Sequence, residues 1–488
     1  MKLIKERTYY LYTVVSSLKL LSLIVFWLIV FLGLGWLVVG PILHYRCAPK
    51  IREVSHSHDL PLMLIIGMIL NYGIIVIFKS LRISLIIESA LSLFGISLFV
   101  IHLYRNKRLF KITLSSLNKW IGIAFLCLLF LGPILANSLY DWDARSIWFF
   151  HAKLIYYAGN FGLSAGWQQP SVGLSHVDYP NLLPTIAAQI CSLMGFWNEN
   201  LPKLSLLFLL LPALIWIFTF SRKSFSFIFL LLLFPFSIYP LIWNGYMDGY
   251  LAFYFAIAML LYGRYLKTSQ TIDLISSFSC LIFLIYLKNE GDLAALCGIF
   301  TIVLITLVKK QLVFSRAAFR KNWKYLLTFL VIVIPFGIWT FYKKQWGLSN
   351  DLQIGTENSL LRILTRLSNG SLWQIFTTEF NQLKTALMIL GMLYFAAVIW
   401  KKQLPEESLP ALITTAIYCL GITFIYLLTP NDLSWHLINS IERTMLPVNG
   451  CIFIGCYFLL DELVTKRISK IDSISSGSML EPMNKRTH

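Results

Sequence analysis

Charged residues are scarce in this chain. They make up 13% of its 488 residues, whereas 57% are hydrophobic. A soluble domain is typically about half apolar and about a quarter charged. Apolar stretches of about 17–25 residues, the length that a transmembrane helix needs, recur along the whole sequence. No segment between them could hold a soluble domain of useful size. The composition therefore argues against a soluble protein and predicts an all-α fold, a polytopic bundle of transmembrane helices.

Cysteine is also sparse and forms no pattern. No CxxC motif or Cys/His ligand spacing occurs, so the sequence indicates neither a zinc site nor a disulfide framework. The sequence indicates no cofactor and no metal ligands, and it leaves a requirement for a divalent metal open. Most of the eight cysteines lie inside apolar runs, among them Cys127, Cys191, Cys280, Cys297, Cys419 and Cys456.

Acidic residues are fewer than basic ones, 23 against 41, which gives a formal charge of +18. The basic residues form short clusters between apolar runs, as in the cytoplasmic loops of membrane proteins, where they also favour anionic membrane lipids. This distribution argues against a nucleic-acid partner. The N-terminal apolar run has no small-residue cleavage site, so we interpret it as a retained span. We expect a multi-pass integral membrane protein, in a bacterial inner or plasma membrane.

The apolar pattern predicts about 13 spans. Placing the basic loops 104–119 and 309–324 in the cytoplasm puts a large loop, 139–202, outside. Within that loop, Leu182 to Phe196 is apolar and short, and we expect a juxtamembrane helix there. The orientation of the first three spans stays open, because this count places the basic N-terminus outside. The predicted spans are 20–41, 62–78, 83–103, 120–138, 203–220, 225–241, 250–266, 271–287, 292–308, 325–342, 383–400, 410–428 and 446–463.

The predicted organisation has five parts. Extra N-terminal spans (1–119) precede a core (120–342) that carries the outer loop 139–202. A second outer loop with amphipathic helices (343–382) and the C-terminal spans (383–465) follow. Residues 466–488 form a basic cytoplasmic tail.

The most polar stretch runs from Tyr140 to Pro184 and holds three Asp, one Arg, one Lys and two His. Asp141 and Asp143 are two residues apart, so in an extended segment their side chains point the same way. If a helix follows over 146–157, Asp143 is a suitable N-cap. Acids beside a membrane are costly and tend to be functional. The alternative interpretation is a solvated acidic loop.

Other polar groups fall in segments predicted to face the same side. Asp248 lies in a short turn, and Lys288 and Glu290 form a charged knot whose members could simply pair with each other. On a helix, His436 and Arg443 share one face with Ser440 and suit a phosphate. A solvated amphipathic turn would give the same pattern.

In order and predicted side, these motifs resemble the GT-C superfamily of integral-membrane glycosyltransferases, near its family-39-like group. The matching segments are Asp141 to Arg145, Asp178 to Pro184 and Gly245 to Asp248, and the resemblance covers roughly 120–463. Three features depart from the family pattern. Three spans precede the usual first one, Asp-Trp-Asp replaces the common Asp-Glu, and no large soluble C-terminal domain is present.

The resemblance implies an enzyme that moves a sugar from a polyprenyl-phosphate donor to a hydroxyl of a lipid or glycan acceptor, on the outer face and with inversion. It implies catalytic acids, with Asp143 the expected base and Asp141 the runner-up: Asp141, Asp143 and Asp248. It implies groups that bind the donor phosphate: Lys288, Arg443 and His436. Expected substrate-binding residues are Arg145, His176, Asp178, Tyr179 and Glu290.

Two other functions stay open. A transporter or lipid flippase would also have many spans and buried charges, although such proteins place their acids at the membrane midplane. A ligase or polymerase of lipid-linked glycans is chemically close to a glycosyltransferase, but we expect it to depend on outer-loop Arg and His more than on Asp.

Overall fold

A computed structural model describes residues 2–44, 59–105, 114–139, 141–220, 239–309, 316–348, 358–400 and 404–477. Within these ranges the chain is all-helical and has no β-strand, only an isolated bridge between Ser80 and Asn160. The prediction of an all-α fold is confirmed. The helices are α1 (Lys2–His44), α2 (Asp59–Phe78), α3 (Leu81–Arg105), α4 (Leu114–Ala136), α5 (Phe149–Ala158), α6 (Leu182–Met194), α7 (Leu204–Phe220), α9 (Tyr239–Trp243), α10 (Asp248–Thr268), α11 (Thr271–Leu284), α12 (Glu290–Val308), α13 (Arg316–Trp346), α14 (Ser359–Ser368), α15 (Ser371–Ile399), α16 (Leu409–Leu428), α17 (Leu433–Thr444) and α18 (Leu446–Gly477).

Ten helical segments of the described chain are long and apolar enough to cross a membrane, which indicates a multi-pass membrane protein. They correspond to ten of the 13 predicted spans. Two more predicted spans, 120–138 and 271–287, contain the shorter apolar helices Trp120–Ala136 and Thr271–Leu284. The span predicted at 225–241 lies almost wholly outside the described residues.

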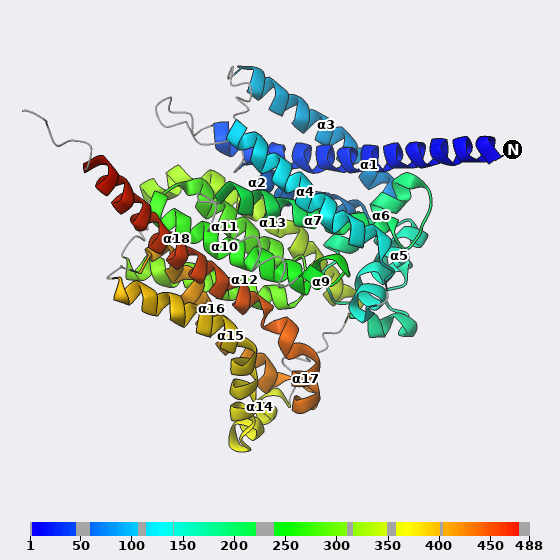
Figure 1. Ribbon diagram of the computed structural model, residues 1–488. Helices are drawn as coiled ribbons and strands as arrows, with labels where there is room; N and C mark the ends of the chain where they lie inside the picture. Colours follow the sequence, from blue (N-terminus) through cyan, green and yellow to red (C-terminus); the bar gives the residue numbers. More distant parts are fainter. Residues whose placement is uncertain are drawn as a thin grey trace, which may run out of the picture.

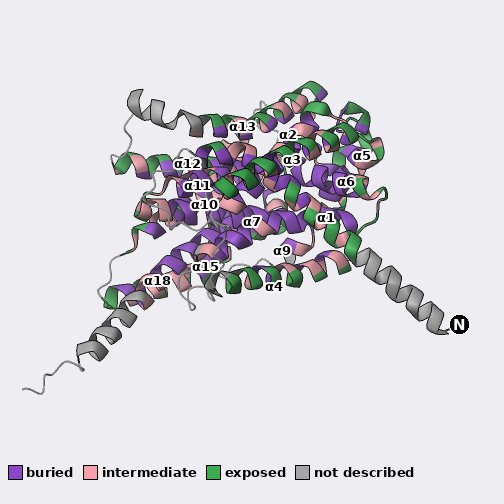
Figure 2. Cartoon of the chain, turned by 90° about the horizontal axis from the view of Figure 1, so that it is seen from above, coloured by how far each residue is buried: buried purple, intermediate pink, exposed green. Residues whose placement is uncertain are grey.

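Helix α10 forms the centre of the bundle. Its first 16 residues, from Asp248 to Gly263, are all buried, and it packs against α7, α11, α16 and α18. Figure 2 shows buried residues over α7, α10 and α11, and exposed ones along α3 and α4. Tyr250 donates its hydroxyl hydrogen bond to carbonyls of Leu206 and Ile242 at 2.9 Å, which ties α10 to its neighbours. The site described below is built on the first turn of this fixed helix.

The predicted outer loop 139–202 is largely helical. A π-helical turn (Ala144–Trp148) runs into α5, and two 3-10 turns (Leu163–Ala165 and Pro170–Ser175) lead to α6. Helix α6 has 13 residues and is buried over Leu182 to Cys191, where it packs against α2, α5 and α7. In Figure 1, α5 and α6 lie together at one end of the bundle. The expected short helix after Asn181 therefore exists, and it is packed into the protein.

Two segments predicted outside the spans are helical in the structure. The segment 371–382, expected in an outer loop, belongs to α15, which is one continuous helix from Ser371 to Ile399. The tail predicted from residue 466 begins as helix, because α18 continues through Gly477. In both cases the polar residues that suggested a loop lie on a helix that continues past the apolar stretch.

Helices α14 and α17 project from the bundle together with the start of α15 (Figure 1). Helix α14 is fastened to the end of α16 by Arg366. Its Nη1 donates to the carbonyls of Tyr426, Leu427 and Thr429, and its Nη2 to that of Asn431, at 2.7–3.3 Å. The last carbonyls of a helix have no partner within the helix, so these bonds satisfy groups that would otherwise be orphaned.

We predict that Arg366→Ala destabilises the protein by about 1–3 kcal/mol, because it leaves half-buried carbonyls at the end of α16 without a donor. The measurement is the thermal unfolding midpoint of the detergent-solubilised protein, which should fall. Lys384→Ala is the matched control, since Lys384 is an exposed cation of α15. Equal midpoints for Arg366→Ala and the wild type would refute the capping role.

Candidate functional site

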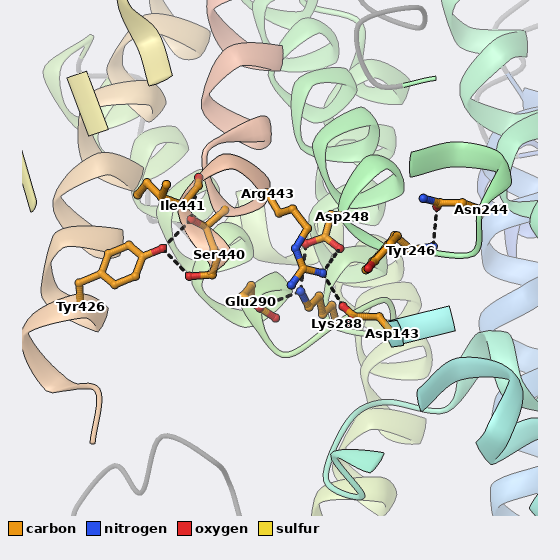
Figure 3. A network of polar contacts seen from close by, with 11 residues as sticks. Asp143, Asn244, Tyr246, Asp248, Lys288, Glu290, Tyr426, Ser440, Ile441 and Arg443 are labelled. Carbon is orange, nitrogen blue, oxygen red and sulfur yellow. Dashed lines mark hydrogen bonds and ion pairs between the residues drawn. The ribbon is translucent and has the colours of Figure 1, made fainter. Parts of the chain in front are cut away.

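Five charged side chains form one alternating chain of ion pairs (Figure 3). Asp143 Oδ2 lies 2.5 Å from Arg443 Nη1, which is also 3.6 Å from Asp248 Oδ2. The other oxygen of Asp248, Oδ1, lies 2.9 Å from Lys288 Nζ, and Glu290 Oε1 lies at the same distance from that nitrogen. Residues up to 300 positions apart in the sequence thus share one continuous network.

All five residues lie at or near helix ends. Asp248 and Glu290 are the first residues of α10 and α12, and Lys288 is in the turn before α12. Arg443 is in the last turn of α17, and Asp143 precedes the π-helical turn. Carboxylates are favoured at helix N-termini, where the helix dipole is positive. The charges are therefore gathered where spans end, as expected for a site at a membrane boundary.

Burial differs along the chain of charges. The side chains of Asp248 and Lys288 are 5% and 6% exposed, whereas those of Asp143, Arg443 and Glu290 are 13%, 28% and 30% exposed. Buried charges are tolerated only when they are paired. Burial alone lowers the pKa of Lys288, but the carboxylates of Asp248 and Glu290 raise it well above its ordinary value. The two carboxylates beside Lys288 therefore favour its charged form.

The turn between α9 and α10 borders the same site. Gly245 has φ +96° and lies where an added Cβ would be 2.8 Å from that of Ala144, so only glycine fits this turn against the π-helical segment. The turn places the ring of Tyr246 4.9 Å from the Arg443 guanidinium carbon, a cation–π contact. Burial raises the pKa of Asp141. A hydrogen bond to Asn244 lowers this pKa in part, and the negative charge of Asp143 raises it further.

The N-cap prediction for Asp143 was wrong. Asp143 has helical backbone angles, φ −59° and ψ −41°, and its side chain makes no capping bond. Its carboxylate instead binds Arg443, because a partly buried guanidinium binds a carboxylate more strongly than a neutral backbone N–H does. The predicted helix over 146–157 is divided into a π-helical turn and α5.

The polar face predicted on α17 does not act as one unit. Ser440 is engaged by the Tyr426 hydroxyl at 2.8 Å, and its own hydroxyl donates to the His436 carbonyl at 2.7 Å. The ring of His436 packs against Tyr426, with centroids 5.1 Å apart, and its Nδ1 is buried without a hydrogen-bond partner among the described residues. Of the predicted face, only Arg443 enters the ion-pair network. Asp432, in contrast, is a true N-cap: its Oδ1 accepts from the backbone N–H of Trp435 at 2.8 Å.

The structure brings three of the predicted substrate-binding residues beside the Lys288–Glu290 turn. Asp178 Oδ2 accepts a hydrogen bond from Asn289 Nδ2 at 2.7 Å. Tyr179, the next residue in the chain, lies close enough to Lys288 to raise the pKa of Lys288. The rings of His176 and Tyr179 have centroids 5.0 Å apart.

Two cations of the polar stretch Tyr140 to Pro184, Arg145 and Lys153, lie apart from the network. Arg145 is exposed and forms no ion pair with any residue that the structure describes. Lys153 binds Glu199 at 2.7 Å and lies over the ring of Trp197. Neither side chain touches the five-charge chain.

Sequence reasoning missed His151, the residue that fixes the polar segment. It is fully buried between Asn181 Oδ1, 2.9 Å from its Nδ1, and Ser175 Oγ, 3.0 Å from its Nε2. A neutral ring with its proton on Nδ1 donates to Asn181 Oδ1, and its Nε2 lies beside the Ser175 hydroxyl, which itself donates to the carbonyl of Val172 at 2.6 Å. Asn289, between the predicted residues Lys288 and Glu290, was assigned no role. No sequence spacing links either residue to its distant partners.

No group of three His, Cys, Asp or Glu side chains within the described ranges is arranged to hold a metal ion. The groups that the site offers are therefore carboxylates and two cations.

Neither the known protein families, nor the curated proteins, nor the solved structures contain a significant match to this chain. A function must therefore be inferred from the geometry of the site.

We predict that stability falls between pH 7 and pH 5 because of His151. Burial lowers the pKa of this histidine from 6.5 to about 4. The unfolded chain therefore binds a proton below pH 6.5 that the folded protein does not bind until about pH 4, and stability is lost as the pH falls through that window. At pH 5 the loss is about 2 kcal/mol.

The measurement is the thermal unfolding midpoint at pH 7 and pH 5. His151→Gln, which cannot ionise, should show a smaller drop between the two values. An equal drop in both proteins would exclude His151 as the titrating group.

Proposed function

We propose that the protein is a membrane glycosyltransferase of GT-C type, which moves a sugar from a polyprenyl-phosphate donor to an acceptor hydroxyl. The observation that carries the proposal is the convergence of a candidate base, Asp143, with two cations, Lys288 and Arg443, at the ends of membrane-spanning helices. This reaction needs a base for the acceptor and positive charge for the leaving phosphate. Both are present within one network.

In the proposed step, the acceptor oxygen attacks the anomeric carbon while the bond from that carbon to the phosphate oxygen breaks. Asp143 takes the acceptor proton, and the lipid phosphate leaves with the electron pair. Donors placed where negative charge develops stabilise the transition state. Lys288 and Arg443 have this role, and a single displacement inverts the anomeric centre. Asp141 lies beside Asp143 and is the alternative base.

Asp248 acts as the positioning group. Its two oxygens face Lys288 and Arg443 from the first turn of α10, so it sets the separation of the two cations. Glu290, Asp178 and Tyr179 line the adjoining turn and contact the sugar or the acceptor. His176 supports Tyr179, and the exposed Arg145, which lies apart from the ion-pair network, contacts the substrate. His436, which interacts electrostatically with Glu290, assists in binding the donor phosphate.

A transporter is the second candidate function, and Glu88 is the observation that favours it. This carboxylate is buried within α3, where both oxygens accept from Gln189 Nε2 at 2.8 and 3.0 Å. Intramembrane acids often mark ion or substrate pathways. The larger collection of charges, however, lies at span ends, where a lipid phosphate would meet the protein, and this favours the transferase.

The test is sugar transfer in membranes that contain the protein, with a panel of radiolabelled decaprenyl-phosphate hexoses and pentoses as donors. Asp143→Asn should reduce transfer roughly 10²–10⁴-fold, because the amide cannot accept the acceptor proton. Glu406→Gln is the control, since Glu406 pairs with Lys309 near the opposite end of α12.

Asp143→Asn membranes with wild-type turnover would remove this residue from the mechanism. If no donor is used and Glu88→Gln alone abolishes movement of lipid-linked sugar across the membrane, the transporter is the correct function.

We further predict that the segment 139–202, and with it the site, faces the outside of a bacterial inner or plasma membrane, because the Lys/Arg-rich loops belong in the cytoplasm. A single cysteine introduced at Pro170, in a variant without the native cysteines, should react with a membrane-impermeant maleimide in intact cells. A cysteine introduced at Lys309 should react only after the membrane is opened. The reverse pattern would invert the orientation.

A further inference from the structure

Asp143 and Arg443, to which the proposed function gives separate tasks, are bound to each other. Asp143 Oδ2 accepts a charge-assisted hydrogen bond from Arg443 Nη1 at 2.5 Å. While this pair is intact, Asp143 Oδ2 is occupied by the guanidinium and is not available to the hydroxyl of an acceptor.

Arg443 holds its two carboxylates with one nitrogen. Asp143 and Asp248 both face Nη1, at 2.5 and 3.6 Å, and the ring of Tyr246 lies over the guanidinium. Among the described residues, Nε and Nη2 have no hydrogen-bond partner. A guanidinium offers its donors in a planar fork that matches two phosphate oxygens. This second edge of Arg443 can therefore receive a phosphate.

The two carboxylates on Arg443 are not equally fixed. Asp248 is 5% exposed, belongs to the first turn of α10, and is also bound by Lys288 at 2.9 Å. Asp143 is more exposed, has Arg443 as its only ion-pair partner in the described chain, and makes no capping bond to the turn that follows. When a third anion approaches Arg443, Asp143 is the carboxylate that can leave.

The charge balance favours that exchange. The network joins three carboxylates to two cations, Lys288 and Arg443, so it already carries a net negative charge. An added phosphate beside Arg443 would repel Asp143 at short range, where screening by salt is weak. Rotation of the Asp143 side chain away from the guanidinium removes this repulsion.

We propose that the phosphate of the lipid-linked donor displaces Asp143 from Arg443, so that donor binding itself releases the catalytic base. The inference rests on the proposed function. Once released, Asp143 Oδ2 no longer has a cation bound to it and can accept the proton of the acceptor hydroxyl. The acceptor is then activated only when a donor is in place, and the donor binds first.

The experiment measures equilibrium binding of decaprenyl phosphate to the full-length protein in phosphatidylcholine nanodiscs. Asp143→Asn removes the charge that competes with the phosphate for Arg443. This variant should bind decaprenyl phosphate roughly five- to tenfold more tightly than the wild type, a gain that corresponds to the free energy of a partly exposed ion pair. Arg443→Ala should bind it more weakly, and Arg443→Lys, which keeps the charge and loses the fork, should lie between Arg443→Ala and the wild type.

Glu406→Gln is the matched control. It removes a carboxylate from an ion pair of the same length, Glu406 Oε2 to Lys309 Nζ at 2.5 Å, in a different part of the bundle. Its affinity for decaprenyl phosphate should equal that of the wild type. Asp143→Ala repeats the test without leaving an amide, in case Asp143→Asn folds poorly.

The outcomes separate the inference from the function on which it rests. If the wild type binds decaprenyl phosphate and neither Asp143 variant binds it more tightly, the displacement of Asp143 is refuted but the transferase function is not. No binding of decaprenyl phosphate by any of the proteins would overturn both. Competition by inorganic phosphate or phosphatidylglycerol as strong as that by decaprenyl phosphate would show a general anion site and would also overturn the inference.

Discussion

The carboxylate of Asp248 is the group on which the rest of the site depends. It is buried at the first turn of the central helix α10, and its two oxygens face Lys288 and Arg443. The buried Lys288 and the partly buried Arg443 would repel each other without an anion between them. Asp248 therefore makes their proximity possible, and its fixed backbone sets where both cations can be. Without the charge of Asp248, Lys288 and Arg443 would repel each other and would not stay close together.

The same arrangement explains why the site joins distant parts of the chain. The turn before α12 supplies Lys288, α17 supplies Arg443, and the polar segment after α4 supplies Asp143. None of these segments forms the site alone. Their alignment depends on the apolar packing of α10 against α7, α11, α16 and α18, which fixes the helix ends relative to one another. The packing that stabilises the bundle therefore also determines the geometry of the site.

The sequence predicted much of this fold and part of the site. Apolar runs were enough for ten spanning helices, because span length is set by the bilayer and not by partners. The polar residues Asp143, Asp248, Lys288 and Arg443 were identified because charges are unusual near spans. Their pairing was not predictable: local rules made Asp143 an N-cap, and the competing Arg443 is 300 residues away. His151 resembled an ordinary histidine because nothing local reveals burial.

A site at helix ends also suits a substrate that is half lipid and half sugar. The phosphate of such a donor must stay near water, while its hydrocarbon tail stays in the bilayer, so the reacting bond lies at the boundary between them. A protein can place strong charges there at lower cost than at the membrane centre, because one side of each group is close to the solvent. Three of the charged residues are partly exposed: Asp143, Arg443 and Glu290. The other two, Asp248 and Lys288, are buried and hold the partly exposed ones in place. The gradient of burial along the five charges thus separates a rigid half of the site from a half that can exchange partners.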